Sequence, residues 1–269
     1  MSANKPAMAV SDQALYPGNQ TSGGNTIYTI DNYDFEAGEG FSPGLLDGQV
    51  GWTVFAASSV QPVIDTSDPS SGAQHVQIAN DPNNGGGTLV GGFSPDLGAQ
   101  PVGVENRVSV DVKITAGGGA DYQVIGQAPS LGFLTWRVNF SWLGNVEVLD
   151  DTGGGLAFED TGVAWPVDTY FNLQVITNPG GSPGIEYYLD GSLIYSQVMM
   201  LSADSIEQVV ILSDNYQFGE VGNFDNLMID SEYVEPAVPA LPVPGLGTFG
   251  IILLSLGLLW TVRRKWVLS

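Results

Sequence analysis

The sequence contains no cysteine and a single histidine. The absence of cysteine excludes a disulfide framework, a thiolate zinc site and a cysteine nucleophile. Because His75 is the only histidine, a multi-histidine metal site cannot form. His75 lies in an apolar segment, so a structural role explains it more simply than a place in a serine–histidine–aspartate triad.

Basic residues are also scarce, and they are unevenly placed. The first 235 residues hold 29 acidic and four basic residues, a net charge of −25, whereas the last 34 residues carry +3. A body this negative would be repelled by nucleic acid and by anionic lipid, so nucleic acid is not expected as a partner. Hydrophobic residues still make up 43% of the chain, which is enough for a folded core.

The end of the chain has the composition of a membrane segment. An uncharged apolar run begins at Thr248 and is followed directly by Arg263, Arg264 and Lys265. Fifteen helical residues span about 22 Å, and snorkelling basic side chains help such a helix to cross a hydrocarbon core of roughly 30 Å. The positive-inside rule keeps the basic stop cytoplasmic, which predicts an exported body. A buried core helix is the alternative.

A short motif precedes the apolar run. Residues 243–250 (VPGLGTFG) resemble the Ile-Pro-Thr-Leu-x-x-Trp-Gly motif of the IPTL-CTERM sorting domain, and the resemblance covers residues 242–266. It implies that an exosortase-type membrane protease cuts near the motif and releases or transfers the body of a bacterial envelope protein. A permanent C-terminal anchor is the alternative. The motif residues are Val243, Pro244, Gly245, Leu246, Phe249 and Gly250, with Gly245 departing from the family's Thr.

Export also requires a signal at the other end of the chain. Residues 1–20 contain no apolar stretch, but Ala7-Met8-Ala9 has the small-x-small form of a signal-peptidase site. We interpret residues 1–27 as a leader remnant or a disordered N-terminus, with a chance Ala-x-Ala as the alternative. The predicted location is the cell envelope: anchored at the inner membrane before processing, with the body in the periplasm, at the cell surface or in the medium.

The body of the chain has the pattern of β-strands. Apolar and polar residues alternate with a period of two in residues 104–114 and 134–142, which is typical of antiparallel strands with one buried face. Asp190-Gly191 between apolar runs predicts a two-residue hairpin turn. Further strands are predicted at residues 28–35, 51–55, 75–79, 88–93, 122–126, 146–149, 170–177, 185–189, 193–197, 208–212 and 223–229.

These patterns predict an all-β fold, an antiparallel two-sheet sandwich, at residues 28–233. A Pro-rich linker follows at residues 234–245, and residues 246–269 form the sorting segment with one transmembrane helix and a basic cytoplasmic end. The linker prolines favour an extended polyproline geometry, which would hold the motif clear of the body for a protease.

The order of motifs in the body resembles that of concanavalin A-like (laminin G-like) jelly rolls. Residues 170–175 (YFNLQV) are followed by a Gly/Pro loop and by residues 185–191 (IEYYLDG), a strand–loop–hairpin order similar to theirs. The segments DFE at residues 34–36 and FDNL at residues 224–227 resemble the first and last strands of exported lectin-like sandwiches. This resemblance implies a fold and not an activity.

In several sandwich carbohydrate-binding families, acidic residues near the terminal strands hold a structural calcium ion. Asp34, Glu36 and Asp225 occupy comparable places here, and calcium takes six to eight oxygen ligands. The resemblance therefore implies a calcium site at these residues. The alternative is ordinary surface acidity.

Glycan binding requires exposed aromatic side chains that stack on sugar rings, with polar groups beside them. Trp52, Trp165, Tyr188 and Tyr216 fall near predicted loops or on the polar side of predicted strands, so we predict them as ligand-binding residues. Trp136 and Trp142 follow the apolar alternation, which places them in the predicted core.

No catalytic residue is predicted. The segment EVLDD at residues 147–151 lacks the spacing and the final glutamate of jelly-roll glucanases, and Gln74 and His75 are adjacent, unlike the Gln-x-His pair of lyases on this fold. We predict an exported interaction or glycan-binding module that contacts extracellular polysaccharide. A polysaccharide-degrading hydrolase or lyase and a structural matrix component are the alternatives.

Overall fold

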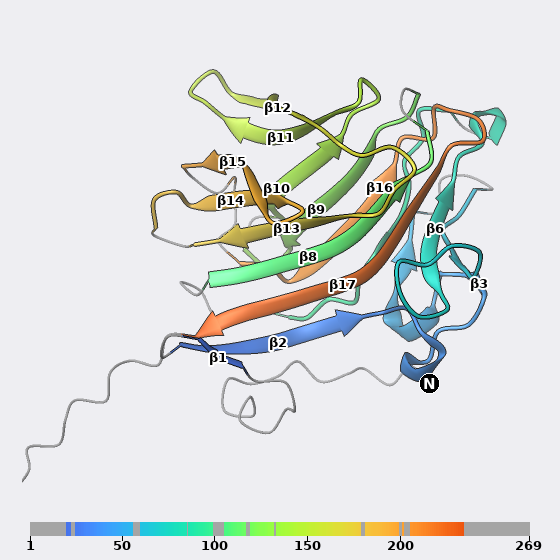
Figure 1. The fold of residues 1–269 in the computed structure, drawn as a ribbon, viewed down its shortest axis with the longest axis horizontal. Coiled ribbons are helices and arrows are strands. Elements are labelled where there is room, and N and C mark those ends of the chain that lie inside the picture. Colours follow the sequence, from blue (N-terminus) through green and yellow to red (C-terminus); the bar gives the residue numbers. More distant parts are fainter. Residues whose placement is uncertain are drawn as a thin grey trace, which may run out of the picture. The chain divides into compact units, whose positions relative to one another are not determined.

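The computed structural model describes residues 20–22, 25–55, 60–84, 86–98, 105–116, 119–131, 133–178, 181–198, 201 and 205–233. These ranges form two antiparallel sheets packed face to face (Figure 1). The predicted all-β antiparallel sandwich is therefore confirmed. The predicted linker and sorting segment, residues 234–269, lie outside the described ranges. Within those ranges, no helix has the length and apolar character that a bilayer crossing requires.

One sheet has ten strands, and its path begins at the β14–β15 hairpin. All its pairings are antiparallel. In spatial order the path is β15 (Ser192–Gln197), β14 (Ile185–Leu189), β13 (Phe171–Thr177), β8 (Glu105–Ile114), β17 (Val221–Tyr233), β6 (His75–Ala79), β5 (Val63–Asp65) and β3 (Gly44–Leu45), while β2 (Asn25–Tyr33) pairs with β17 and with β1 (Gln20–Ser22).

The other sheet has seven strands, again all antiparallel. Their order is β12 (Leu156–Ala164), β11 (Asn145–Asp151), β10 (Phe133–Phe140), β9 (Tyr122–Ala128), β16 (Gln208–Ser213), β7 (Val90–Phe93) and β4 (Thr53–Val54). Helical structure in the described ranges is limited to the short 3-10 turns Ala37–Glu39, Gln49–Gly51 and Pro82–Asn84.

β17 runs through the middle of the ten-stranded sheet. It pairs with β8 on one side, and on the other side it pairs first with β6 and then with β2 (Figure 1). The change of partner coincides with a register shift between Asp225 and Met228, where Asn226 has a φ of 50°. The predicted closing strand, residues 223–229, is therefore confirmed and is longer at both ends.

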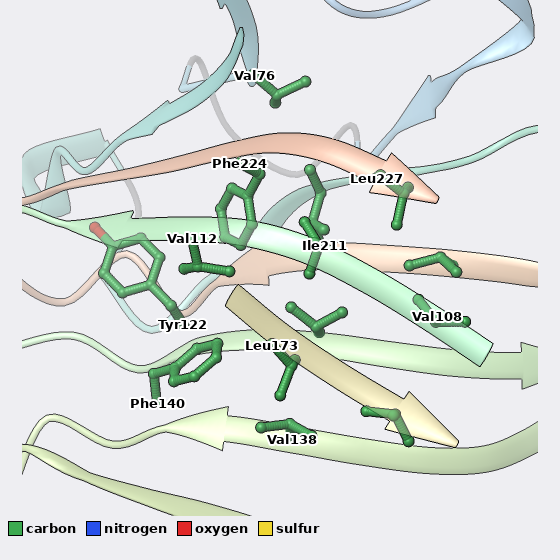
Figure 2. Packing of buried hydrophobic residues seen from close by; sticks show 14 of the residues in the cluster. Val76, Val108, Val112, Tyr122, Val138, Phe140, Leu173, Ile211, Phe224 and Leu227 are labelled. Atoms are coloured by element: carbon green, nitrogen blue, oxygen red, sulfur yellow. The ribbon is translucent and has the colours of Figure 1, made fainter. Parts of the chain in front are cut away.

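The core lies between the two sheets and is filled by their alternating apolar residues. β8 shows a strict alternation, with Val108, Val110, Val112 and Ile114 buried, as its period of two predicts. Figure 2 shows how these side chains meet those of the opposite sheet. Its labelled residues are Val76, Val108, Val112, Leu173, Phe224 and Leu227 of the ten-stranded sheet and Tyr122, Val138, Phe140 and Ile211 of the seven-stranded sheet.

The predicted Asp190-Gly191 turn is confirmed. Both residues have positive φ, 47° and 74°, which is the geometry of a two-residue hairpin loop, and they join β14 to β15. The Asp190 side chain also accepts a hydrogen bond from the Asn172 N–H at 2.8 Å. This contact ties the turn to the neighbouring strand β13.

Candidate functional site

The outer face of the seven-stranded sheet carries the most unusual combination of side chains in the described ranges. Along β9, Tyr122 and Val124 point into the core, so Gln123, Ile125 and Gln127 lie on the outer face. All three of these outer residues are nevertheless buried. A sheet face that keeps amide side chains away from water is not an ordinary solvated surface.

One half of this outer face is apolar. Ile125, Val210 and Leu212 form a second buried cluster, separate from the core, on the adjacent strands β9 and β16. Phe55, Phe93 and Leu134 pack against it. The ring centroids of Phe55 and Phe93 are 4.4 Å apart. This cluster forms an apolar wall beside the polar residues of β9, β10 and β11.

The other half of the face holds four side chains that we call the polar strip: Gln123, Arg137, Asn139 and Glu147. Arg137 Nε donates to Gln123 Oε1 at 2.8 Å, and Asn139 Nδ2 donates to Glu147 Oε2 at 2.9 Å. Gln123 and Asn139 are 5% and 2% exposed. The register places Asn139 opposite both Gln123 and Glu147, so the strip crosses three neighbouring strands.

Arg137 sits in a partly dehydrated position. Its guanidinium carbon lies 5.2 Å from the centroid of the Phe158 ring, which covers it from β12. Burial lowers the pKa of Arg137, because removing water disfavours the charged form, while the negative charge of Asp121 acts in the opposite direction. The side chain stays protonated at any physiological pH, so the strip contains a fixed positive charge.

At one end of the same sheet, aromatic side chains project into solvent from two turns. Trp142 lies between β10 and β11 and is 53% exposed, and Tyr216 lies between β16 and β17 and is 61% exposed. Phe218 belongs to the second turn and is exposed as well. We call Trp142, Tyr216 and Phe218 the aromatic rim.

A short relay of carboxylates joins the two rim turns. Asp121 Oδ1 accepts the Trp142 N–H at 2.8 Å, and Asp214 Oδ1 accepts the N–H groups of Asp121 at 3.1 Å and Tyr216 at 3.3 Å. Asp121 directly precedes β9 and Asp214 directly follows β16, and these strands are paired. The relay therefore holds the Trp142 and Tyr216 backbones beside each other at the end of the polar strip.

Glu220 is buried behind this relay and is only 1% exposed. Neither carboxylate oxygen makes a hydrogen bond of normal geometry. Burial raises the pKa of Glu220 to about 7, the charges of Asp214 and Asp121 act in the same direction, and the nearby Ala120 N–H opposes them. Burial and the Asp121 charge also raise the pKa of Asp214, although the N–H groups that it accepts favour its ionised form.

The structure corrects two of the four predicted ligand-binding aromatic residues. Trp52 is fully buried, with ring centroids 5.6 Å from Tyr33 and 5.5 Å from Phe35, so its predicted exposure is wrong. Trp165 is also buried, and its indole N–H donates to the Ser141 carbonyl at 3.3 Å. Neither side chain can stack on an external sugar.

The other two predicted aromatic residues lie on different parts of the molecule. Tyr188 is half-buried on β14 of the ten-stranded sheet, and its hydroxyl donates to Glu186 at 3.1 Å. Tyr216 belongs to the aromatic rim. Trp136 is in the core as predicted, but the core position predicted for Trp142 is wrong because β10 ends at Phe140.

Two of the three predicted calcium ligands, Glu36 and Asp225, hold the loop at residues 70–74 in the described structure. Glu36 Oε1 accepts the N–H groups of Ala73 at 2.6 Å and Gln74 at 3.0 Å, and Asp225 Oδ2 accepts those of Ser70 at 2.9 Å and Ser71 at 3.1 Å. Asp34 accepts from Asn32 at 3.1 Å. Within the described ranges no three acidic or histidine residues are grouped as a metal site. Calcium binding stays a prediction.

The acidic segment of β11 does not form a pair of facing carboxylates. Glu147 lies on the outer face, whereas Asp150 lies on the inner side of the strand and accepts the Tyr195 hydroxyl at 2.9 Å. His75 is fully buried on β6. Burial lowers the pKa of His75, and Asp65, whose Oδ2 is 4.0 Å from Nε2, opposes that shift.

The sorting motif at residues 243–250 and the basic stop at residues 263–265 lie outside the described ranges. The polar strip was not predicted as a site. Its residues occupy the polar positions of the alternation, which a solvated strand face fills in the same way.

Comparisons with known proteins address the fold. No protein-family model and no curated protein matches the chain. Among solved structures, it is similar to an endo-beta-1,4-glucuronan lyase from the fungus Trichoderma reesei (10% identity, TM-score 0.51), over 70% of this chain and 92% of the lyase. It is also similar to a conserved carbohydrate esterase from Shiga toxin-encoding bacteriophage phi24B (12% identity, TM-score 0.51), over 76% of this chain and 98% of the esterase.

A match to a sialidase has a TM-score of 0.49 and 13% identity, and it covers 67% of this chain but only 17% of the sialidase. At these identities a match identifies architecture and not activity. The lyase and the esterase, together with the two antiparallel sheets, identify the body of this chain as a β-sandwich of the jelly-roll kind.

Proposed function

We propose that this chain is a carbohydrate-binding β-sandwich whose ligand lies across the outer face of the seven-stranded sheet. The observation that carries the proposal is the fixed, solvent-exposed aromatic rim at the end of a buried polar strip. Indole and phenol rings stack on the apolar faces of pyranose rings, while amides and carboxylates bind the hydroxyl groups. The rim and the strip supply both kinds of contact at the same end of the seven-stranded sheet.

The names of two structural neighbours make glycans the first ligands to test. One neighbour is a glucuronan lyase and the other a carbohydrate esterase. Their low identity to this chain carries no residue-level argument, so the support comes from the chemistry of the face itself. Extracellular polysaccharide is the ligand class that this chemistry fits.

Binding fits this face better than hydrolysis does. A retaining glycosidase needs two carboxyl groups about 5 Å apart on the same side of the ligand. Here Glu147 and Asp150 lie on opposite sides of β11, and Glu147 is already hydrogen-bonded to Asn139. A polysaccharide-degrading enzyme therefore stays the second candidate.

The proposal includes export. The support is the difference in charge between the acidic body and the basic stop at Arg263, Arg264 and Lys265. The resemblance of residues 242–266 to a sorting domain supports export as well. An exported glycan-binding body that passes through an exosortase-type protease would meet polysaccharide in the envelope. Its position before processing would be the inner membrane.

The aromatic rim gives the direct test of carbohydrate binding. In the full-length chain purified in mild detergent, Trp142→Ala or Tyr216→Ala is expected to weaken binding to a ligand identified on a glycan array about tenfold each, because each removes one stacking surface. Titration calorimetry measures the change in Kd. Leu193→Ala, which removes an exposed apolar side chain from the other sheet, should leave the Kd unchanged. Wild-type affinity in both rim variants would remove the proposed site.

A further inference from the structure

Arg137 is the only lysine or arginine in the described ranges that takes no part in an ion pair. The other two such residues are both paired: Arg107 Nη2 lies 2.6 Å from Glu105 Oε1, and Lys113 Nζ lies 2.6 Å from Asp68 and 3.0 Å from Asp168. The chain has 29 acidic residues to choose from. In a chain this acidic, the lack of an ion pair at Arg137 is a consequence of where the residue lies on the sheet.

The surroundings of Arg137 favour the binding of an anionic group to its guanidinium. Its one side-chain hydrogen bond in the described structure uses Nε, which donates to Gln123, so the two terminal nitrogens keep their donor capacity. Phe158 lies against the guanidinium and Ile125 is its register partner on β9. A guanidinium that has lost part of its hydration beside apolar groups gains more from an anionic partner than an exposed one does.

A second group on the same face also lacks a partner. Asn139 Oδ1 is buried and accepts no hydrogen bond. The orientation of this amide follows from chemistry, because its NH₂ group must face the Glu147 carboxylate to which it donates. Asn139 follows Arg137 by two residues along β10, so the two side chains share a face about 6.6 Å apart.

The unpaired guanidinium of Arg137 and the unsatisfied Asn139 Oδ1 can be complemented by different groups of one ligand. The terminal nitrogens of Arg137 can donate to a carboxylate in a bidentate pair, and Asn139 Oδ1 can accept a hydroxyl hydrogen. A molecule that carries a carboxylate and hydroxyls a few ångströms apart on a rigid ring is a sugar acid. A neutral sugar would satisfy Asn139 but would leave the guanidinium without a counter-charge.

We propose that the polar strip binds a uronic acid residue of a glycan, with its carboxylate on Arg137 and a ring hydroxyl on Asn139. This assignment rests on the proposed function and names its ligand class. The chain's net charge of −22 sets a limit on the glycan. A densely charged polyuronate would be repelled by the body, so the matching ligand carries its uronic acid at a chain end or at wide intervals.

The test compares two oligosaccharides that differ only at one end. One is capped by glucuronic acid and the other by glucose, and both are titrated into the full-length chain in mild detergent. Wild type is expected to bind the acidic compound at least tenfold more tightly. Arg137→Gln is expected to abolish this preference, because glutamine cannot pair with a carboxylate by charge. Arg107→Gln, which removes an arginine from the other sheet, should keep the preference.

Each result decides the question. Equal wild-type affinity for the two caps overturns the uronic acid assignment and leaves glycan binding in place. A preference that survives Arg137→Gln overturns the role of Arg137. No binding of either compound, together with a blank glycan array, removes the proposed function and with it this assignment. The wild-type comparison needs no variant, so a folding defect in Arg137→Gln would not hide the answer.

Discussion

Glu220 is a carboxyl group that the fold keeps out of water and close to two other acids. Its pKa is raised to about 7, and burial is the main cause. Burial also raises the pKa of Asp225 to about 6, against the opposing effect of the backbone N–H groups that it accepts. Both groups therefore bind protons more tightly in the folded chain than in the unfolded chain.

The pH dependence of stability follows from the sign of these shifts. A carboxyl group with a raised pKa destabilises the fold when it is ionised, so stability is highest below the unfolded pKa near 4.5 and falls as pH rises towards 7. Glu220→Gln should raise the free energy of unfolding at pH 8 by up to about 3 kcal/mol and change it little at pH 4.5. Urea titrations at the two pH values measure both effects.

A surface variant provides the control for this prediction. Asp47 is exposed, so Asp47→Asn should leave the difference between the two pH values unchanged. In the Glu220→Gln variant, the raised pKa of Asp225 still contributes part of the pH dependence of stability. An unfolding free energy that rises between pH 4.5 and 8 in wild type would contradict the prediction.

Two tryptophans show why single residues resist prediction from sequence. Trp142 continues an apolar alternation, but the chain turns at Ser141, whose carbonyl accepts the Gly144 N–H at 2.8 Å, and the ring leaves the sheet. Trp52 follows a turn in which Gly48, with a φ of 78°, donates to the Trp52 carbonyl. That turn carries the ring into a cluster with Tyr33. In both cases the turn beside the tryptophan, and not the apolar alternation, decides where the ring lies.

The candidate site could not be predicted from the sequence for a related reason. Arg137 has the same sequence signal as a solvated polar residue in an alternating strand. Its lack of an ion pair depends on what β9, β11 and β12 place around it, and those strands belong to other parts of the chain. A missing partner is a property of three-dimensional packing that no local pattern records.

At the scale of single elements, sequence periodicity works where one face of a strand is buried. The strands predicted at residues 75–79 and 185–189 have the predicted ends, and β8 follows its alternation. β10 departs from its alternation at Leu134, which packs against the outer cluster beside a register shift. β12 was missed because it is an edge strand in which every residue is exposed or half-buried, so hydrophobic burial imposes no pattern on it. β3 and β5, of two and three residues, are too short to show a period.

β9 leaves no room for a larger side chain at Gly126. A Cβ atom added at Gly126 would lie 2.4 Å from Trp136 Cε2 and 2.8 Å from Ile206 Cδ1. Gly126→Ala should therefore overpack the core and lower the free energy of unfolding by about 1–3 kcal/mol. Chemical denaturation measures this loss.

Gly154 is the matched control for this substitution. It lies between β11 and β12, and nothing within 4 Å would meet an added Cβ atom. Gly154→Ala should be neutral or slightly stabilising, because alanine reduces the entropy of the unfolded chain. Equal stability of the two variants would contradict the close packing of β9 against Trp136.

At the scale of the whole molecule, the acidic body and the basic end of the chain predict export and sorting, and this prediction can be tested. If an exosortase-type protease processes the chain, the mature protein should end near residues 243–250 and lack the basic stop, because cleavage falls near the motif. Intact-mass analysis of the protein from its native envelope measures the end directly. A C-terminus still at Ser269 would contradict processing and favour a permanent anchor.

The length of β17 has a further consequence if the predicted linker follows this strand. A pull directed along the axis of β17 would load a 13-residue strand that is paired with β8 on one side and with β6 and β2 on the other. The ladder bonds lie across that axis, so they share the load in shear and do not open one at a time. A body tethered in this way would resist extraction by flow or drag, since forced unfolding is limited by the rate at which such a strand slips.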